Sequence, residues 1–177
     1  MNRLNTVRLL TLALLMGFAG VAQAQSAAEA NAWMAELEQT EVRDITEGEM
    51  KRLLGAMEEI EAMEGAINTD SPTMFDAIQA NAEASSVLSR YDFDGPEFKV
   101  VVHNVMLAMG ALAMRDQKAE LDMAVQQLQA MKGQLPEAQY QALERQVLGA
   151  IQLFDRAPAS NIALVEKYKA EIESIGE

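Results

Sequence analysis

The chain has 177 residues and a formal net charge of −13, from 27 acidic and 14 basic side chains, which disfavours binding to nucleic acid and to anionic lipid surfaces. It contains no cysteine, so no disulfide bond can stabilise it. Its length allows one domain to bury an ordinary core without a metal ion.

Residues 1–24 have the composition of a secretory signal peptide. Arg3 and Arg8 supply a basic start, and the apolar stretch that follows ends in the small-residue sequence Ala-Gln-Ala at Ala24. This stretch is shorter than the roughly 20 residues that span a bilayer. We therefore expect cleavage before Gln25, a periplasmic or secreted protein, and no stable membrane anchor after cleavage.

The mature segment, residues 25–177, is predicted to form a single all-α domain. Its apolar residues recur at spacings of three and four, and good helix formers dominate its composition. A capping box opened by Ser26 begins a short first helix, which we expect to dock loosely. A second capping box, opened by Thr46, begins a helix whose apolar stripe extends to Ile67.

The next boundaries are marked by proline and by a change of phase. Ser71, followed by proline, predicts the start of a third helix that continues through Leu88. The apolar stripe that ends at Leu112 is half a turn out of phase with the stripe that begins at Leu121. We therefore expect a break within residues 115–118.

Glycine and proline mark the last boundaries. Gly133 is expected to end one helix, Pro136 to open another and Pro158 to break that one, before a final helix from about Ser160 through Ile175. About six to seven short to medium helices with short connections predict a compact bundle of mostly antiparallel neighbours.

The best-marked turn has the sequence Tyr-Asp-Phe-Asp-Gly-Pro-Glu at residues 91–97. Gly95 and Pro96 interrupt the helical pattern. Asp94 is placed to cap the helix that follows, and Glu97 to return the cap.

The aromatic side chains around this turn could pin two helices together. We interpret Tyr91, Phe93 and Phe98 as core anchors rather than as a ligand site. A calcium-binding EF-hand loop is excluded, because it requires an oxygen ligand where Pro96 stands and a glycine where Glu97 stands.

Catalysis is not expected. A nucleophilic triad needs a nucleophile, a base and an orienting group, whereas this chain has no cysteine and one histidine, His103. No phosphate-binding, dinucleotide-binding or zinc-protease motif occurs, so no cofactor is predicted. We expect a buried or half-buried structural histidine bonded to a backbone oxygen. Carboxylate chemistry stays open, although near-consecutive glutamates usually form a solvated face, as at Glu58, Glu59, Glu61 and Glu64.

A copper site is the alternative interpretation of the histidine. His103, Met106 and Met109 lie three residues apart on one side of a helix, and imidazole with thioether ligands suits Cu(I). Methionine also fills irregular helical cores. Four methionines fall on stripes with leucine, isoleucine and valine, namely Met50, Met57, Met109 and Met131.

The remaining interpretation is binding to other chains. Methionine-bearing faces adapt to varied apolar surfaces, and an acidic exterior keeps complexes soluble. The composition therefore favours a non-catalytic binding or envelope accessory protein whose partner is another envelope protein or an apolar client. Chaperone-like binding of unfolded clients is one form of this hypothesis.

Three stretches of the chain carry a family resemblance. The first stretch contains Ile-Thr at residues 45–46, followed by Glu49 and Arg52. The second contains Tyr-Asp-Phe at 91–93, followed by Phe98 and by Val-Met at 105–106. The third contains Pro-Ala-Ser-Asn at 158–161. Together they resemble an uncharacterised class of small exported bacterial helical proteins. The resemblance covers most of the mature chain and implies an exported all-helical fold, but no activity.

Overall fold

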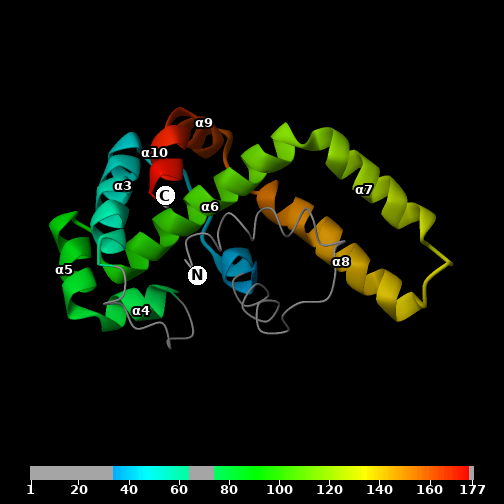
Figure 1. Ribbon diagram of the computed structural model, residues 1–177, viewed down its shortest axis with the longest axis horizontal. Coiled ribbons are helices and arrows are strands. Elements are labelled where there is room, and N and C mark those ends of the chain that lie inside the picture. The colour runs from blue at the N-terminus through cyan, green and yellow to red at the C-terminus, as the bar shows by residue number, and fades with distance from the viewer. Residues whose placement is uncertain (1–33, 64–73, 176–177) are drawn as a thin grey trace.

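The computed structural model describes residues 34–63 and 74–175 (Figure 1). All regular secondary structure in these two ranges is helical, which confirms the predicted all-α class. The predicted signal peptide, the cap at Ser26 and the helix start at Ser71 lie outside the described residues.

Within the described ranges, a short helical segment at residues 34–39 precedes a series of longer and shorter helices. These are α3 (Glu47–Glu61), α4 (Met74–Ala80), α5 (Ala82–Arg90), α6 (Gly95–Asp116), α7 (Lys118–Ala130), α8 (Glu137–Phe154), α9 (Ala159–Lys167) and α10 (Lys169–Ser174).

The long helix α6 is the centre of the fold, and α3, α4, α5, α7, α8 and α9 all contact it. Its most apolar 18-residue stretch has a mean hydropathy of 1.3, so by length and composition it could span a bilayer. More than half of that stretch, 56%, is buried against other helices. A helix that is apolar on nearly all sides is expected at the middle of a helical core, which is the position that α6 occupies.

The main core lies around the first half of α6. Side chains from α3, α4, α5, α6 and α9 meet there, including the fully buried Met50, Ile78, Phe98, Val101 and Val165. A smaller second cluster lies further along α6 and contains Leu37, Leu107, Leu153 and Phe154.

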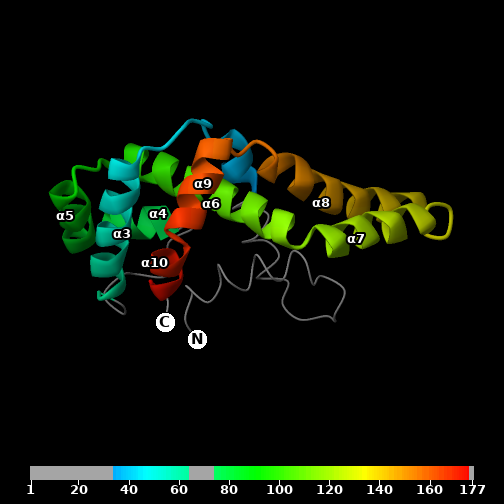
Figure 2. The same ribbon diagram turned by 90° about the horizontal axis from the view of Figure 1, so that it is seen from above.

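Helices α7 and α8 form an antiparallel hairpin, which we call the arm, that extends away from the other helices (Figures 1 and 2). Its base contacts α6, and the two helices contact each other along the hairpin. Short connections predict a compact bundle, whereas in the structure a break at Gln117 turns the chain out of line with α6. The molecule is therefore elongated along the arm.

Most of the predicted boundaries are confirmed where the structure describes them. Thr46 caps α3 through a complete capping box with Glu49. The predicted break within residues 115–118 falls at Gln117, and the chain reverses at Gly133, whose φ of 81° favours glycine. Helix α8 begins directly after Pro136.

Two predicted helices are each divided in the structure. The helix expected to continue through Leu88 is interrupted at Asn81, whose side-chain oxygen accepts hydrogen bonds from the backbone of Glu83 and Ala84 and so caps α5. The final helix is interrupted at Tyr168 between α9 and α10. Asparagine caps as well as serine does, and apolar periodicity alone does not reveal such a break.

Candidate functional site

An extended segment, residues 40–46, joins the helical segment at 34–39 to α3 and lies beside the start of α9 (Figure 2). We call this segment the strap. It has no regular secondary structure, so its backbone polar groups need partners from elsewhere. Those partners are side chains of α3, α6 and α9 and of the loop after α8.

Two fully buried asparagines hold the strap. Asn104 of α6 accepts a hydrogen bond from the Arg43 N–H (3.1 Å) and donates one to the Glu41 carbonyl (2.9 Å). Asn161 of α9 accepts from the Ile45 N–H (2.9 Å) and donates to the Arg43 carbonyl (2.8 Å). Each amide supplies a donor and an acceptor to an extended backbone, as a neighbouring β-strand would.

Arg156 holds the start of the strap by satisfying helix-terminal carbonyl groups. Its guanidinium donates hydrogen bonds to the carbonyl oxygens of Leu37 (3.3 Å), Glu38 (2.9 Å) and Thr40 (3.0 Å). The last carbonyls of a helix have no intrahelical partner and favour a cation. The arginine therefore fixes the end of the helical segment at 34–39 against the loop that follows α8.

The second apolar cluster lies beneath this fixed segment. Leu37 is fully buried against Leu107 of α6 and against Leu153 and Phe154, which end α8. A loosely docked first helix was expected, but a fully buried leucine and the Arg156 hydrogen bonds show firm docking. The helical segment and the strap together cover the apolar surface at the base of the arm.

His103 contacts the strap from α6 and is 1% exposed. Its Nδ1 lies 2.6 Å from Thr40 Oγ1, and that hydroxyl donates to the Glu36 carbonyl at 2.9 Å. Because the hydroxyl proton is used in that bond, His103 Nδ1 carries its own proton and donates it to Thr40. The histidine is buried as predicted, but its partner is a hydroxyl rather than a backbone oxygen.

The second ring nitrogen of His103 has no partner. Nε2 is buried without a hydrogen bond in the described structure, and the nearest carboxylate oxygen, Glu36 Oε2, is 3.8 Å away. That carboxylate forms an ion pair with Lys99 at 3.3 Å. Burial, and then the charge of Lys99, lowers the pKa of His103 to about 4, so the ring is neutral at pH 7.

The predicted copper ligands all lie on α6. His103 is buried, whereas Met106 and Met109 are half-buried and pack against the main core. Within residues 34–63 and 74–175 no three histidine, cysteine or acidic side chains come together to hold a metal ion. Copper binding stays a prediction of the sequence.

The aromatic turn is a structural joint between α3, α5 and α6. Asp94 accepts a hydrogen bond from the Glu97 N–H at 2.7 Å, and Pro96 occupies the first turn of α6. Phe93 and Phe98 are buried with their rings edge to face, 5.8 Å apart. Tyr91 was expected in the core but is half-buried, because its hydroxyl donates to Glu59 at 2.8 Å.

Arg52 closes the same turn from α3. Its guanidinium stacks 4.6 Å from the centre of the Phe93 ring and donates to the carbonyl oxygens of Tyr91 (3.2 Å) and Asp92 (2.6 Å). The Glu97 carboxylate, expected to return the cap, accepts from this arginine at 3.4 Å. With its polar groups bonded within the fold, this region serves packing.

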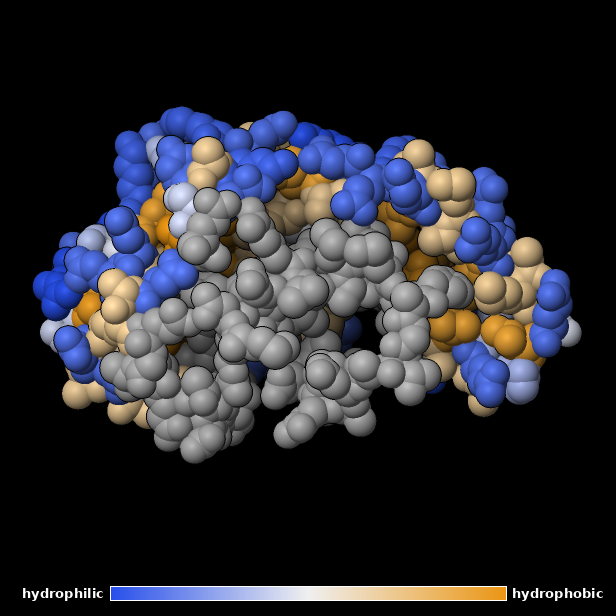
Figure 3. Space-filling view, viewed as in Figure 1, coloured by the Kyte–Doolittle hydropathy of each residue, from blue (hydrophilic) through white to orange (hydrophobic). Residues whose placement is uncertain are grey.

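The arm carries a line of half-buried apolar side chains, which we call the arm seam. Its members are Leu121, Val125, Leu128, Met131, Leu135, Tyr140, Leu143, Val147, Leu148 and Ile151. Only Leu128 and Tyr140 among them are buried. Apolar atoms are visible along the arm in Figure 3. A side chain added at Gly149 would meet nothing within 4 Å, so that side of α8 is open.

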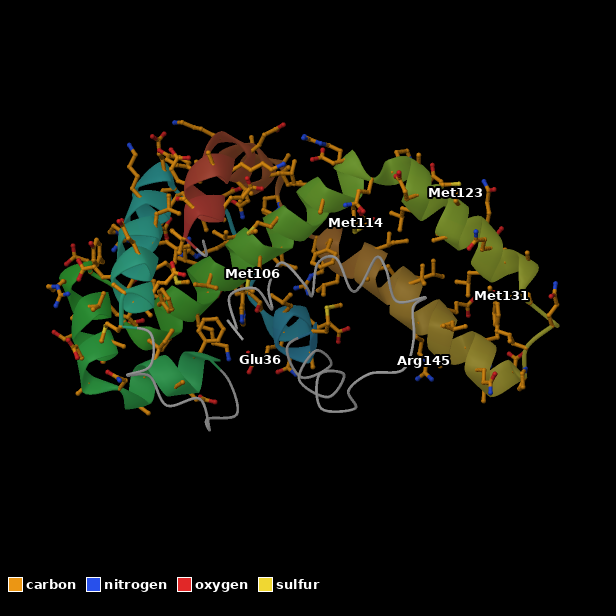
Figure 4. The ribbon with its side chains drawn as sticks, in the orientation of Figure 1. Glu36, Met106, Met114, Met123, Met131 and Arg145 are labelled. Carbon is orange, nitrogen blue, oxygen red and sulfur yellow. The ribbon has the colours of Figure 1, made fainter. Side chains whose placement is uncertain are left out.

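Three methionines, Met114, Met123 and Met131, lie on the arm or near its base (Figure 4). Met114 near the end of α6 and Met131 near the end of α7 are half-buried, and Met123 is 54% exposed. Met50 is the one buried methionine among those whose side chains the structure describes. The predicted packing role is confirmed for Met50, which is buried in the main core, and for Met57 and Met109, which pack against it, whereas Met131 lies half-buried on the arm.

Comparison with known proteins identifies no relative of this chain. The chain matches no protein-family model, curated protein or solved structure. The site is therefore defined by its own geometry.

Sequence reasoning missed the residues that hold the strap. Asn104, Arg156 and Asn161 lie 61 to 119 positions from their backbone partners, so no local pattern identifies those partners. Two signals were available: an asparagine within the apolar stretch around Val102 and Val105 of α6, and the Pro-Ala-Ser-Asn stretch that ends at Asn161. A buried polar side chain requires hydrogen-bond partners, and no residue nearby in the sequence identifies them.

Proposed function

We propose that this protein is an exported, non-catalytic binding protein that holds apolar segments of unfolded envelope proteins against its arm. The observation that carries the proposal is the arm seam, which stays half-buried along two helices. A two-helix hairpin covers one side of each helix, so part of each apolar stripe remains open to a partner.

The charge distribution supports a flexible, partly basic client. Residues 117–154 carry three basic and four acidic side chains, so the arm is nearly neutral, while the whole chain carries 14 and 27. Apolar client segments would bind the neutral arm, and basic residues flanking them would be attracted to the acidic remainder.

The side-chain composition of the arm supports binding to varied sequences. Methionine is flexible and polarisable, so it repacks against differently shaped apolar groups. Met131 belongs to the arm seam, and Met114 lies near the base of the arm. Adaptable surfaces of this kind are typical of proteins that bind many partners.

The test is the aggregation of an unfolded client at neutral pH. Reduced lysozyme is a suitable basic client, and the reductant leaves this protein unchanged because it has no cysteine. We expect the protein, purified after export, to slow the rise in light scattering at one molar equivalent. An unchanged aggregation rate for lysozyme and for several exported clients would refute the proposal.

Paired variants of α7 locate the binding surface. Leu121→Glu with Met131→Glu places two charges within the arm seam, and we expect at least about tenfold weaker client binding from the lost apolar contact. Gln126→Glu with Gln129→Glu adds the same two charges at exposed polar positions of the same helix. Equal effects of the two pairs would show that the arm acts only through its charge.

Export itself has a direct measurement. Native mass spectrometry of the protein isolated from its own host is expected to give a chain that begins at Gln25, since the signal peptide is removed. A mass that includes residues 1–24 would contradict export by cleavage.

A further inference from the structure

We infer that the strap is a releasable cover over the base of the arm, and that protonation of His103 releases it to enlarge the client-binding surface. This inference rests on the proposed function and adds a means of regulating it. Three features of the structure carry it: how the strap is held, what lies beneath it, and where His103 contacts it.

Residues 40–45 of the strap can separate while Thr46 keeps its place as the cap of α3. Its backbone is held by side-chain hydrogen bonds from Asn104, Asn161 and Arg156, and none of its own residues belongs to a helix. Segments with few buried apolar contacts open at lower free energy than the core. Ile45 is the strap's buried apolar anchor, and Val42 is half-buried.

Release would expose an apolar surface that continues the arm seam. Leu37, which precedes the strap, lies over Leu107, Leu153 and Phe154. Leu153 and Phe154 follow Ile151 of the seam on the same helix. Movement of the strap with Leu37 would therefore join the seam to the second apolar cluster in one continuous face.

His103 is placed to sense acid at the contact between α6 and the strap. Its Nδ1 proton is donated to Thr40, and its Nε2 lone pair is buried without a partner. The groups that face it are the Glu36 carboxylate, the ammonium of Lys99 on α6, and the Phe75 ring of α4, whose centre is 5.0 Å from that of the imidazole.

A proton added at Nε2 would not be well accommodated in the closed arrangement. Glu36 is already paired with Lys99, and the Phe75 ring carries no charge. The charged ring gains hydration only if the segment that carries Glu36 and Thr40 moves away. Acid therefore favours the released strap.

The expected size of the effect follows from the two protonation equilibria. An exposed histidine has a pKa of 6.5 and buried His103 has a pKa of about 4. The closed strap is fully favoured above pH 6.5, and its advantage is lost as the pH falls from 6.5 towards 4. The ratio of released to closed strap should rise by up to about 300-fold across this interval.

The test compares three proteins between pH 7.5 and pH 4: the full exported chain, His103→Gln, and a locked variant, Asp44→Cys with Ser160→Cys. The lock uses the hydrogen bond between the Ser160 hydroxyl and Asp44, and no native cysteine interferes with it. Hydrogen exchange of the Arg43 and Ile45 amides, corrected for intrinsic rates, measures release. Fluorescence of bis-ANS measures exposed apolar surface.

In the native chain, both signals are expected to rise below pH 6.5 while far-ultraviolet circular dichroism stays constant. The oxidised lock should abolish the rise and reductant should restore it, and His103→Gln should remove the pH dependence. A rise that persists in the oxidised lock or in His103→Gln would overturn the inference. Client binding at pH 7.5 tests the proposed function separately, because the closed strap leaves the arm seam accessible.

Discussion

Replacement of Asn161 by alanine should destabilise the fold more than any surface substitution. The side chain is fully buried, and its amide bonds the buried Ile45 N–H at 2.9 Å and the Arg43 carbonyl at 2.8 Å. Leaving a buried donor unpaired costs about 1–3 kcal/mol, and loss of the part-buried hydrogen bond to the Arg43 carbonyl adds about 1 kcal/mol. We therefore expect Asn161→Ala to lower the free energy of unfolding by about 2–4 kcal/mol.

Urea unfolding followed by circular dichroism measures this loss, with Asn81→Ala as the control. Asn81 is half-buried and caps α5, and loss of such a cap costs about 1 kcal/mol. A loss in Asn161→Ala no larger than in the control would refute the reasoning. Asn104→Ala combined with Asn161→Ala should be less destabilising than the sum of the two, because both side chains hold the same strap.

Two further predictions concern the glycines and the acid sensitivity of the fold. Gly110→Ala should destabilise the fold by about 1–3 kcal/mol, because a Cβ there would lie 2.2 Å from the Phe154 ring. Gly149→Ala should stabilise the fold by about 0.5–1 kcal/mol, because a Cβ there meets nothing within 4 Å and alanine favours a helix. Thermal unfolding of both variants tests this pair of predictions. Burial alone would raise the pKa of Glu49, but hydrogen bonds from Arg43 and Thr46 outweigh it and hold the pKa at about 2. Glu49 therefore contributes about 3 kcal/mol to the stability of the fold above pH 4.5, and this contribution is lost as the pH falls towards 2. Glu49→Gln should flatten this part of the profile of stability against pH. An unchanged profile would contradict this prediction.

Local signals in the sequence predicted most helix boundaries correctly. Thr46, Gln117, Gly133 and Pro136 act through capping, phase or backbone conformation, which depend on a few neighbouring residues. The break at Asn81 was missed because an asparagine fits a helical pattern until its side chain caps the next helix.

The candidate site was largely beyond local reasoning. The sequence showed that His103 is buried, but not that Thr40, 63 positions away, would be its partner. The arm seam has the same spacing of apolar residues as a core helix. Whether such a stripe is covered depends on the number of helices that pack against it, which periodicity does not determine.

The long span between the strap and its anchors also imposes an order on folding. The Ile45 amide bonds Asn161, 116 positions later, and the Leu37 carbonyl bonds Arg156, 119 positions later. Chains are made from the N-terminus, so the strap has no anchor on α9 until nearly the whole polypeptide has been synthesised. The strap is therefore among the last segments to be fully secured, and a chain truncated before α9 would retain Asn104 and Arg156 but lose the Asn161 hydrogen bonds to Arg43 and Ile45.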